Sequence, residues 1–492
     1  MAVNFDNSYA QLGVPFSAAQ LPDPVAQPGL IAVNSALAIE LGFDPDWLAS
    51  NEGVAALAGN AAIDGSEPIA AAYSGHQFGQ FNPQLGDGRA VLLGEILTAD
   101  GRRYDLQLKG SGRTPWSRGG DGRSPLGPVL REYLVSEAMT ALGVPSTRAL
   151  AAVTTGEKVY RDTLLPGAIL ARVAASHLRV GTLQCFAARE DRESLTTLVD
   201  HVLRRHYPDK ADAENPALTL LKAVVTAQAG LIAKWQLLGF IHGVMNTDNM
   251  LLSGETVDYG PCAFMENFHS DTVFSSIDHQ GRYAYCNQPA IAQWNLTRLA
   301  EALLPLIHEN TDAAVELAKD AIQLFPHLYG AAYREGLAKK LGLSALTEAD
   351  DELGESLFIA LQDDAADFTL AFRFLAESLS PDGNGTSDGD TASLFEPGKH
   401  LLEWLPRWRQ RLGQDGRDVA QVQAGMFAAN PVFIARNHLV QRAIEEGEGG
   451  DFSFFHRLLK RLSEPSRFDA ANLDLARPAE PQERVLRTFC GT

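Results

Sequence analysis

Residues 242–252 read His-Gly-Val-Met-Asn-Thr-Asp-Asn-Met-Leu-Leu, and residues 258–260 read Asp-Tyr-Gly. The first stretch ends in an apolar pair, and the second places a carboxylate directly before an aromatic residue and a glycine. Mg²⁺ prefers carboxylate and amide oxygens together with phosphate oxygens. Asn249 and Asp258 supply these two kinds of oxygen from neighbouring segments. We therefore predict that they are the ligands of a metal site.

The spacing of these residues is that of a kinase catalytic loop whose base is missing. Protein kinases and small-molecule phosphotransferases place an Asp two residues after the His, an Asn seven residues after it, and then an Asp-aromatic-Gly. Here Val244 takes the position of the Asp. An aliphatic side chain neither accepts a proton nor orients a hydroxyl group, so ordinary phosphoryl transfer through this position is excluded. Asp248 is an unusually placed carboxylate, for which we predict a catalytic role rather than capping of the loop.

The charge of the chain restricts its partners. The 492 residues carry a formal charge of −20, which argues against nucleic acids and anionic membranes, since both are bound through basic surfaces. Residues 89–131 form a locally basic, glycine-containing segment within this acidic protein. Such a segment suits a small polyanion such as a nucleoside triphosphate.

The cysteines and the N-terminal residues indicate a cytoplasmic protein. Four scattered cysteines, Cys185, Cys262, Cys286 and Cys490, are too few for a disulfide framework or a CxxC metal site. The first residues lack the basic and apolar regions of a secretion signal, and no run of about 18 uncharged apolar residues occurs. We predict neither secretion nor a membrane span.

Four regions follow one another along the chain. Residues 1–70 mix short helical patterns with proline-rich turns and form an N-terminal wrapping segment; residues 71–175 alternate strands with a helix; residues 176–300 contain the 242–260 motifs; residues 301–492 are mainly helical in pattern. We predict an α+β, protein-kinase-like two-lobed fold (71–175 and 176–300) with an additional α-helical C-terminal region. The predicted elements are strands at 90–96, 104–109, 146–160 and 168–174, and helices at 125–142, 218–238, 294–307 and 313–324.

A glycine turn and a lysine repeat the kinase pattern upstream. Gly86 and Gly88 flank an Asp just before a predicted strand, where glycines let the backbone approach phosphate oxygens, although a plain hairpin turn has the same signature. Lys109 follows at the end of the next strand, and Glu132 lies on the helix after it. We predict a Lys109–Glu132 ion pair that fixes the ammonium group near phosphate.

Two further arginines and the loop histidine have less distinctive patterns. Arg172 and Arg179 are seven residues apart, which fits either two helical turns or an extended arm, and from either an arginine pair can clamp phosphates. Surface salt bridges are the alternative. We expect His242 to hold the backbone of its loop rather than to act as an acid or a metal ligand.

The chain also resembles the selenoprotein O (YdiU-type) family, pseudokinases that act as protein adenylyltransferases. The resemblance covers nearly the whole length. Its motifs are residues Tyr73 to Gly79, Gly86 to Ala90, Gln107 to Gly112, Asn246 to Met250, Asp258 to Pro261, and Asn430 to Pro431 with Arg436 to His438.

This resemblance implies that ATP binds inverted relative to kinases, so that AMP is transferred to a protein hydroxyl of Ser, Thr or Tyr and pyrophosphate leaves. It implies Asp248 as proton acceptor, with Lys109 and Glu132 as its catalytic companions. Asn249 and Asp258 become ligands of Mg²⁺ or Mn²⁺. The implied nucleotide-binding positions are Gly86, Gly88, Arg89, Lys109, Asp121, Gly122, Arg172, Arg179 and Asp258.

Three other functions compete with adenylyl transfer. A true kinase is disfavoured by Val244. An inactive ATP-binding scaffold is disfavoured by the joint presence of Lys109, Glu132, Asn249 and Asp258, because a scaffold needs no complete metal site. Transfer of UMP from UTP stays open. Cys490 resembles a family position near the C-terminus, where pairing with Cys262, Cys286 or no partner would decide whether the protein has redox control.

Overall fold

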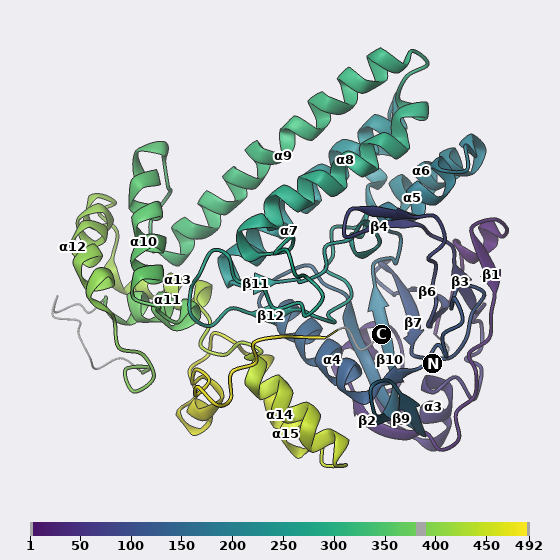
Figure 1. Cartoon of the computed structure of the whole chain (residues 1–492), viewed down its shortest axis with the longest axis horizontal. Coiled ribbons are helices and arrows are strands. Elements are labelled where there is room, and N and C mark those ends of the chain that lie inside the picture. Colours follow the sequence, from purple (N-terminus) through teal and green to yellow (C-terminus); the bar gives the residue numbers. More distant parts are fainter. Residues whose placement is uncertain (1–2, 380–389, 490–492) are drawn as a thin grey trace.

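An eight-stranded antiparallel sheet, two two-stranded sheets and a larger set of helices build the computed structural model, which describes residues 3–379 and 390–489 (Figure 1). The α+β class predicted from sequence is confirmed. The strands are β1 (Ser17–Ala19), β2 (Gly29–Val33), β3 (Ile69–Ala71), β4 (Gly75–Gln77), β5 (Gln80–Asn82), β6 (Ala90–Leu97), β7 (Arg103–Lys109), β8 (Ser124–Pro125), β9 (Arg148–Tyr160), β10 (Leu164–Ala174), β11 (Phe240–Ile241) and β12 (Ala263–Phe264).

Most of the helices follow the last long strand, β10. They are α1 (Ser35–Glu40), α2 (Pro45–Ala49), α3 (Asn51–Leu57), α4 (Leu126–Ala141), α5 (Val180–Ala187), α6 (Arg192–His206), α7 (Pro216–Leu238), α8 (Gln288–Ile307), α9 (Thr311–Lys340), α10 (Asp351–Asp363), α11 (Phe368–Glu377), α12 (Lys399–Gln414), α13 (Val419–Ala429), α14 (Asn437–Glu448) and α15 (Ser453–Leu462). All eight predicted elements are present, with ends that differ by a few residues; α8 and α9 are markedly longer than predicted.

The main sheet has the strand order β1-β3-β6-β7-β10-β9-β2, with the short β8 paired to β10. Side chains alternate across a strand. On β7, Leu106 and Leu108 therefore join the apolar core beneath α1 to α3, while Gln107 and Lys109 point to the opposite face. Arg172 of β10 is the register partner of Gln107. The sheet thus presents a row of polar groups on the face away from α1 to α3.

The N-terminal region contributes more to this sheet than its sequence indicates. Short helices were predicted in residues 1–70, and α1 to α3 are present, but β1 and β2 also form the two edge strands by pairing with β3 and β9. Each is three to five residues long. Strands this short are specified by the partners they meet far along the chain, so local pattern does not reveal them.

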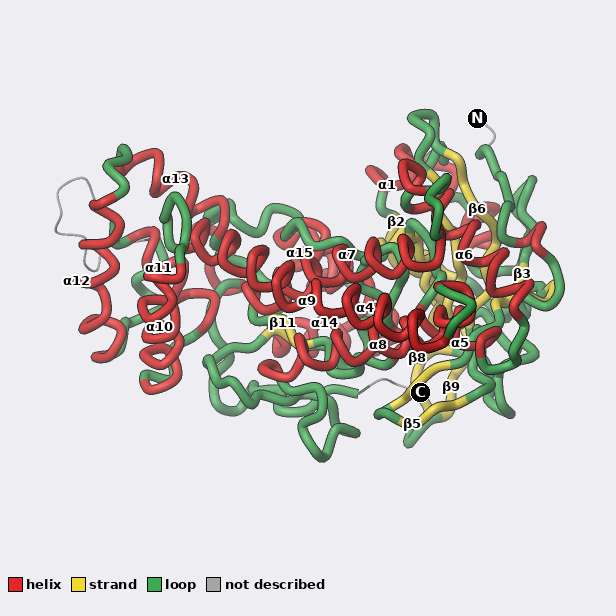
Figure 2. The backbone as a smooth tube through the Cα atoms, turned by 90° about the horizontal axis from the view of Figure 1, so that it is seen from above, coloured by secondary structure: helices red, strands yellow, loops and turns green. Residues whose placement is uncertain are grey.

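Helix α7 delivers the chain to the 242–252 loop. It ends at Gly239, which adopts a left-handed conformation (φ 67°) and donates to carbonyls of the last turn, as glycine commonly does after a helix. Within the part of the chain that the structure describes, α7 alone is long and apolar enough to cross a membrane by length and composition. It packs against α6, α8 and α9 and is mostly buried, as expected of a core helix (Figure 2).

The C-terminal helices form two groups. Helices α10 to α13 share an apolar core with the end of α9, while α14 and α15 return to pack against α4 (Figure 1). Tyr133 of α4 and Phe455 of α15 meet edge to face with ring centroids 5.6 Å apart, and both are buried. Helix α4 is therefore enclosed between the sheet and the C-terminal helices.

This packing predicts a large effect of Phe455→Ala. Truncating a fully buried Phe leaves a cavity and costs about 3–5 kcal/mol of unfolding free energy, measurable by urea denaturation. Phe489→Ala is the matched control, since Phe489 is 66% exposed and surface truncations stay within about 0.5 kcal/mol. Equal losses in the two variants would contradict the assigned packing.

Candidate functional site

A cavity of about 620 Å³ lies between the polar face of the sheet and the 242–260 segment. It brings together every predicted site residue except Glu132, which lies just behind Lys109. The predicted residues that line it are Gly86, Gly88, Arg89, Lys109, Asp121, Gly122, Arg172, Arg179, Asp248, Asn249 and Asp258. Seven cationic and four acidic side chains line this cavity, although the whole chain carries a charge of −20.

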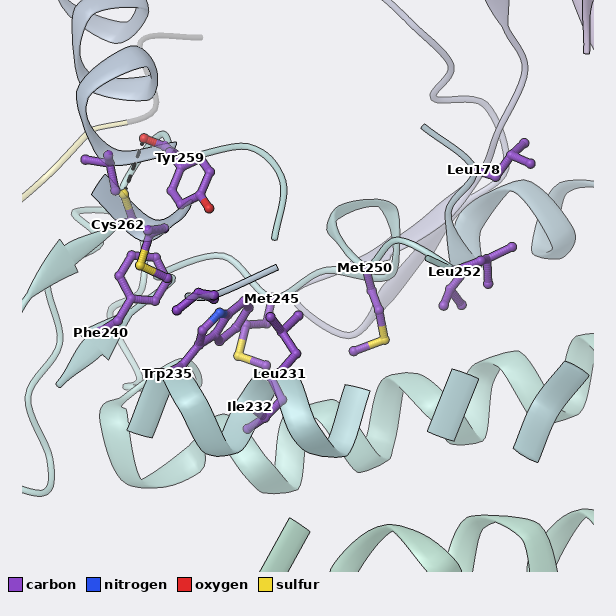
Figure 3. Close-up of a cluster of buried hydrophobic side chains, with 14 of the residues drawn as sticks. Leu178, Leu231, Ile232, Trp235, Phe240, Met245, Met250, Leu252, Tyr259 and Cys262 are labelled. Carbon is purple, nitrogen blue, oxygen red and sulfur yellow. Dashed lines mark hydrogen bonds between the residues drawn. The ribbon is translucent and has the colours of Figure 1, made fainter. Parts of the chain in front are cut away.

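Apolar residues anchor the loop from below. Met245, Met250 and Leu252 are buried; Met245 lies beside Leu231 and Trp235 of α7, and Leu252 lies near Leu178 (Figure 3). The polar residues between them, Asp248 and Asn249, form a short 3-10 turn at the cavity. Because apolar and polar residues alternate in the loop, its apolar side chains pack into the core while its polar side chains face the cavity.

His242 holds the loop, as predicted. Its Nε2 donates to the Val257 carbonyl (2.9 Å), its Nδ1 accepts from the Val244 amide (3.4 Å), and its ring stacks on Trp235. Burial lowers the pKa of His242, which favours the neutral ring that this pattern requires. Val244 itself lines the cavity, so the position of the missing base faces the site and carries no chemistry.

Four charged groups form the centre of the site, of which Lys109, Glu132 and Arg172 are buried and Asp258 is partly buried. Lys109 Nζ contacts Glu132 Oε2 at 2.6 Å, which confirms the predicted ion pair, and it also contacts Asp258 Oδ1 at 2.5 Å. Arg172 Nη1 reaches the same two acids, Glu132 at 3.0 Å and Asp258 at 2.7 Å. Two cations and two carboxylates therefore compensate one another where water is largely excluded.

Further contacts extend this centre along the sheet. The Gln107 side-chain oxygen accepts from Arg172 Nη2 at 2.6 Å. Arg179 stacks on Tyr73 and lies 3.8 Å from Asp87 and 3.9 Å from Asp258. The two arginines are in extended segments, Arg172 on β10 and Arg179 just before α5. The helical alternative for this pair is therefore excluded.

The acids of the site have opposite pKa shifts. Burial raises the pKa of Asp258, but the attraction of Lys109, Arg172 and Arg179 outweighs it and holds the pKa well below its ordinary value. Burial raises the pKa of Asp248 to about 6, and Arg179 only partly opposes it. Asp258 is thus a permanent anion, whereas Asp248 is a carboxylate that readily takes a proton.

The glycine turn is closed by the loop that follows β7. A Cβ on Gly86 would lie 2.3 Å from the Trp116 ring, and one on Gly88 would lie 2.9 Å from the Trp116 carbonyl. Gly122 has a φ of 68°, and its Cβ would lie only 1.9 Å from the Gly112 carbonyl. Close approach of backbone segments therefore requires glycine at these three positions.

Several residues that line the cavity were not predicted from the sequence. Arg161, in the turn between β9 and β10, pairs with Asp121 at 2.9 Å, and no local pattern marks it. Gln77 hydrogen-bonds to Asp248 at 3.1 Å. Its segment had been recognised only as a family motif without a role. Asp87 lies between the two predicted glycines, but its contact with Gln107 depends on the sheet.

The donor set fits a divalent cation bound with a nucleotide. The Asn249 amide nitrogen donates to the Val244 carbonyl at 3.0 Å, which leaves its oxygen as the ligand atom. Asp258 is ionised and lines the same cavity. Within the described residues no group of three His, Cys, Asp or Glu side chains could hold a metal alone. Phosphate oxygens would complete such a site, as Mg²⁺ requires.

Cys490 lies outside the described residues. Thr488, two residues before Cys490, donates a hydrogen bond from its hydroxyl to the Pro261 carbonyl at 2.5 Å. The C-terminal segment therefore meets the chain just after the Asp-Tyr-Gly motif.

Comparisons with known proteins agree over most or all of the chain. A family model described as protein adenylyltransferase SelO matches residues 1–463. A protein nucleotidyltransferase YdiU of Rhodopseudomonas palustris (strain BisB5) is 56% identical over 491 residues, 99% of each chain. Proteins of the same name from Rhizobium meliloti (strain 1021) and Rhizobium leguminosarum bv. trifolii (strain WSM2304) are 54% and 53% identical over 492 residues, which are all of this chain and 100% and 98% of theirs.

The close contact at Gly122 predicts weaker nucleotide binding by Gly122→Ala. The added methyl group forces the Gly112 backbone to move, and we expect ATP affinity to fall by about tenfold or more, equivalent to about 1.4 kcal/mol, as measured by titration calorimetry with Mg²⁺. Gly119→Ala is the control, because Gly119 also has a positive φ but a Cβ there meets nothing within 4 Å. Equal weakening would show that strain alone, not the contact, is responsible.

Asp248→Asn is predicted to stabilise the protein in the absence of metal and nucleotide. Because the folded pKa of about 6 lies above the ordinary 3.8, the acid destabilises the fold increasingly as pH rises from about 4 to 6. The amide should therefore gain up to about 3 kcal/mol above pH 6 and little at pH 4. Urea denaturation in EDTA at several pH values measures this, with the exposed Asp64→Asn as control. A pH-independent difference would contradict it.

Proposed function

This chain belongs to the protein adenylyltransferase SelO family, and we propose that it transfers AMP from ATP to Ser, Thr or Tyr hydroxyl groups of proteins, with release of pyrophosphate. Family membership makes it a nucleotidyltransferase that takes a nucleotide substrate. The observation that carries the finer proposal is the placement of two carboxylates in one cavity. Asp248 is a proton acceptor away from the usual base position, which Val244 occupies, and Asp258 is a fixed anion among cations.

The buried cations support a position for the triphosphate. Lys109, Arg172 and Arg179 are almost fully buried, whereas Arg118 is exposed at the edge of the cavity. Guanidinium groups bind phosphate oxygens through paired hydrogen bonds. We place the β- and γ-phosphates on the buried cations, so that the leaving pyrophosphate stays where its charge is best stabilised. The Gly86–Gly88 turn and the loop containing Gly122 then border the nucleotide.

This arrangement leaves the α-phosphate for the acceptor. The acceptor oxygen forms a bond to the α-phosphorus while the bond from that phosphorus to the bridging oxygen breaks. The hydroxyl proton passes to the Asp248 carboxylate, and pyrophosphate leaves with the bonding electrons. Inverted ATP in a kinase-like two-lobed fold is part of this proposal. It explains Val244, because a base at that position is not needed once the reacting phosphorus has moved.

Asn249 and Asp258 would hold the divalent cation, Mg²⁺ or Mn²⁺. When bound, it neutralises phosphate charge and draws electron density from the bond that breaks. With Asp258 engaged as a metal ligand, Lys109 and Arg172, which contact it in this structure, would be available to bind the phosphates. Before a ligand binds, the charged side chains of the site are therefore paired with side chains of opposite charge.

The proposed partners and location follow from the same properties. The names of the relatives indicate proteins as acceptors, and the negative charge of the chain argues against nucleic acids and anionic membranes. We propose a cytoplasmic location. The competing functions are UMP transfer from UTP and a catalytically inactive ATP-binding scaffold.

We expect protein labelling from ATP carrying ³²P in the α-position and none from ATP labelled in the γ-position, in the presence of Mg²⁺ or Mn²⁺. Asp258→Ala should abolish the labelling, because it removes a proposed metal ligand and leaves Lys109 and Arg172 with Glu132 as their one shared carboxylate. Competition by unlabelled UTP tests the choice of nucleotide.

Each alternative has its own outcome in this experiment. Label from the γ-phosphate alone would establish a kinase. ATP binding without any label would favour the scaffold, and efficient transfer from α-labelled UTP in place of ATP would establish UMP transfer.

A further inference from the structure

The hairpin β4–β5 lies over the catalytic loop and is not used by the proposed mechanism. Its two-residue turn, Phe78 and Gly79, has a positive φ at both positions (52° and 83°), as in the tight turns that suit twisted hairpins. The amides of His76 and Phe78 donate to the side chains of Thr247 (2.7 Å) and Asn246 (3.1 Å). The hairpin is therefore fixed on the residues that directly precede Asp248.

One face of β4 contacts the Asp248 carboxylate. Residues i and i+2 of a strand share a face, and here they are Gly75 and Gln77. Gln77 Nε2 donates to Asp248 Oδ2 at 3.1 Å, and among the described residues it is the one side chain that hydrogen-bonds to this acid. A Cβ on Gly75 would lie 2.9 Å from Asp248 Oδ1. One oxygen is thus held by a donor and the other lies against bare backbone.

We propose that Gln77 is a positioning residue for Asp248 and that Gly75 provides the space in which it does so. This inference rests on the proposed role of Asp248 as proton acceptor. A carboxylate on a short turn rotates about its terminal torsion unless a partner fixes its plane. The Gln77 amide fixes that plane and leaves a lone pair of Oδ2 for the acceptor hydroxyl, because one carboxylate oxygen accepts two hydrogen bonds.

The opposite face of β4 shows why the hairpin cannot adjust. His76 points away from Asp248, where its Nδ1 lies 2.9 Å from Gln184 Nε2 and its ring packs against Trp294. Gln184 in turn accepts from the Thr247 hydroxyl at 2.7 Å. The strand is therefore clamped between the loop and the helices, so the position of Gln77 is set by the fold and not by the nucleotide.

The test compares Gln77→Met with wild type in steady-state transfer of α-labelled AMP to protein. Methionine keeps the length of the side chain and removes the donor. We expect kcat to fall by about tenfold to a hundredfold, as small misplacements of reacting groups do, while the calorimetric affinity for ATP and the melting temperature stay at wild-type values. The kcat of Gln77→Glu should fall further, since this substitution places a second carboxylate beside Asp248.

Two more variants complete the design. Gly75→Ala inserts a methyl group against Asp248 Oδ1 and should also lower kcat without weakening ATP binding. Gln80→Met is the matched control, because Gln80 is the exposed cross-strand partner of Gln77 in the same hairpin, and it should transfer AMP like wild type.

The inference is overturned if the kcat of Gln77→Met stays within about twofold of wild type. It is also overturned if the fall in kcat is accompanied by a matching fall in melting temperature or ATP affinity, or if the kcat of Gln80→Met falls as much. Wild-type protein that transfers no AMP would instead overturn the proposed function, so the two failures are distinguishable.

Discussion

Compensation of buried charge is the constraint on which the site depends. Lys109, Arg172 and Glu132 are almost fully removed from water, and Asp258 is largely so. An isolated ion in such a place costs several kcal/mol of unfolding free energy even after relaxation. The four groups are tolerated because each contacts two groups of opposite sign. In the proposed function, a nucleotide and its metal would replace contacts within this set, so that binding would start from side chains that are already paired with opposite charges.

The same charges connect parts of the chain that are far apart in sequence. Lys109 belongs to β7, Arg172 to β10, Glu132 to α4, and Asp258 to the turn after the catalytic loop. None of these elements can shift alone without leaving a buried charge unpaired. Helix α4 is further enclosed by α14 and α15. The packing of the fold therefore maintains the Lys109–Glu132 contact, because the helix that carries Glu132 is enclosed and cannot move away from the sheet.

Sequence analysis predicted eight strands and helices, among them those that carry Lys109, Glu132 and Arg172, and it predicted the residues at the centre of the site, for a physical reason. The 242–252 motif, the strand ending in Lys109 and the helix with Glu132 are each encoded within a short segment, and their chemistry requires particular residue types. Arg161 and Gln77 differ, since their roles exist only where a turn between β9 and β10 and a hairpin meet distant segments. The edge strands β1 and β2 were missed for the same reason. Position in the assembled sheet, not local propensity, makes them strands.

The C-terminal helices have a further physical role at Asp258. This residue has a φ of 63°, a left-handed conformation that Asp adopts more readily than most residues but less readily than glycine. Residues from the C-terminal part of the chain contact the segment that follows it. Thr488 donates to the Pro261 carbonyl, and Asn437 of α14 donates to the Phe264 carbonyl at 3.0 Å. Residues from the far end of the sequence thus restrain the segment that follows Asp258. The C-terminal helical region therefore adjoins both acids of the charge centre, because α14 and α15 also pack against α4, the helix that carries Glu132.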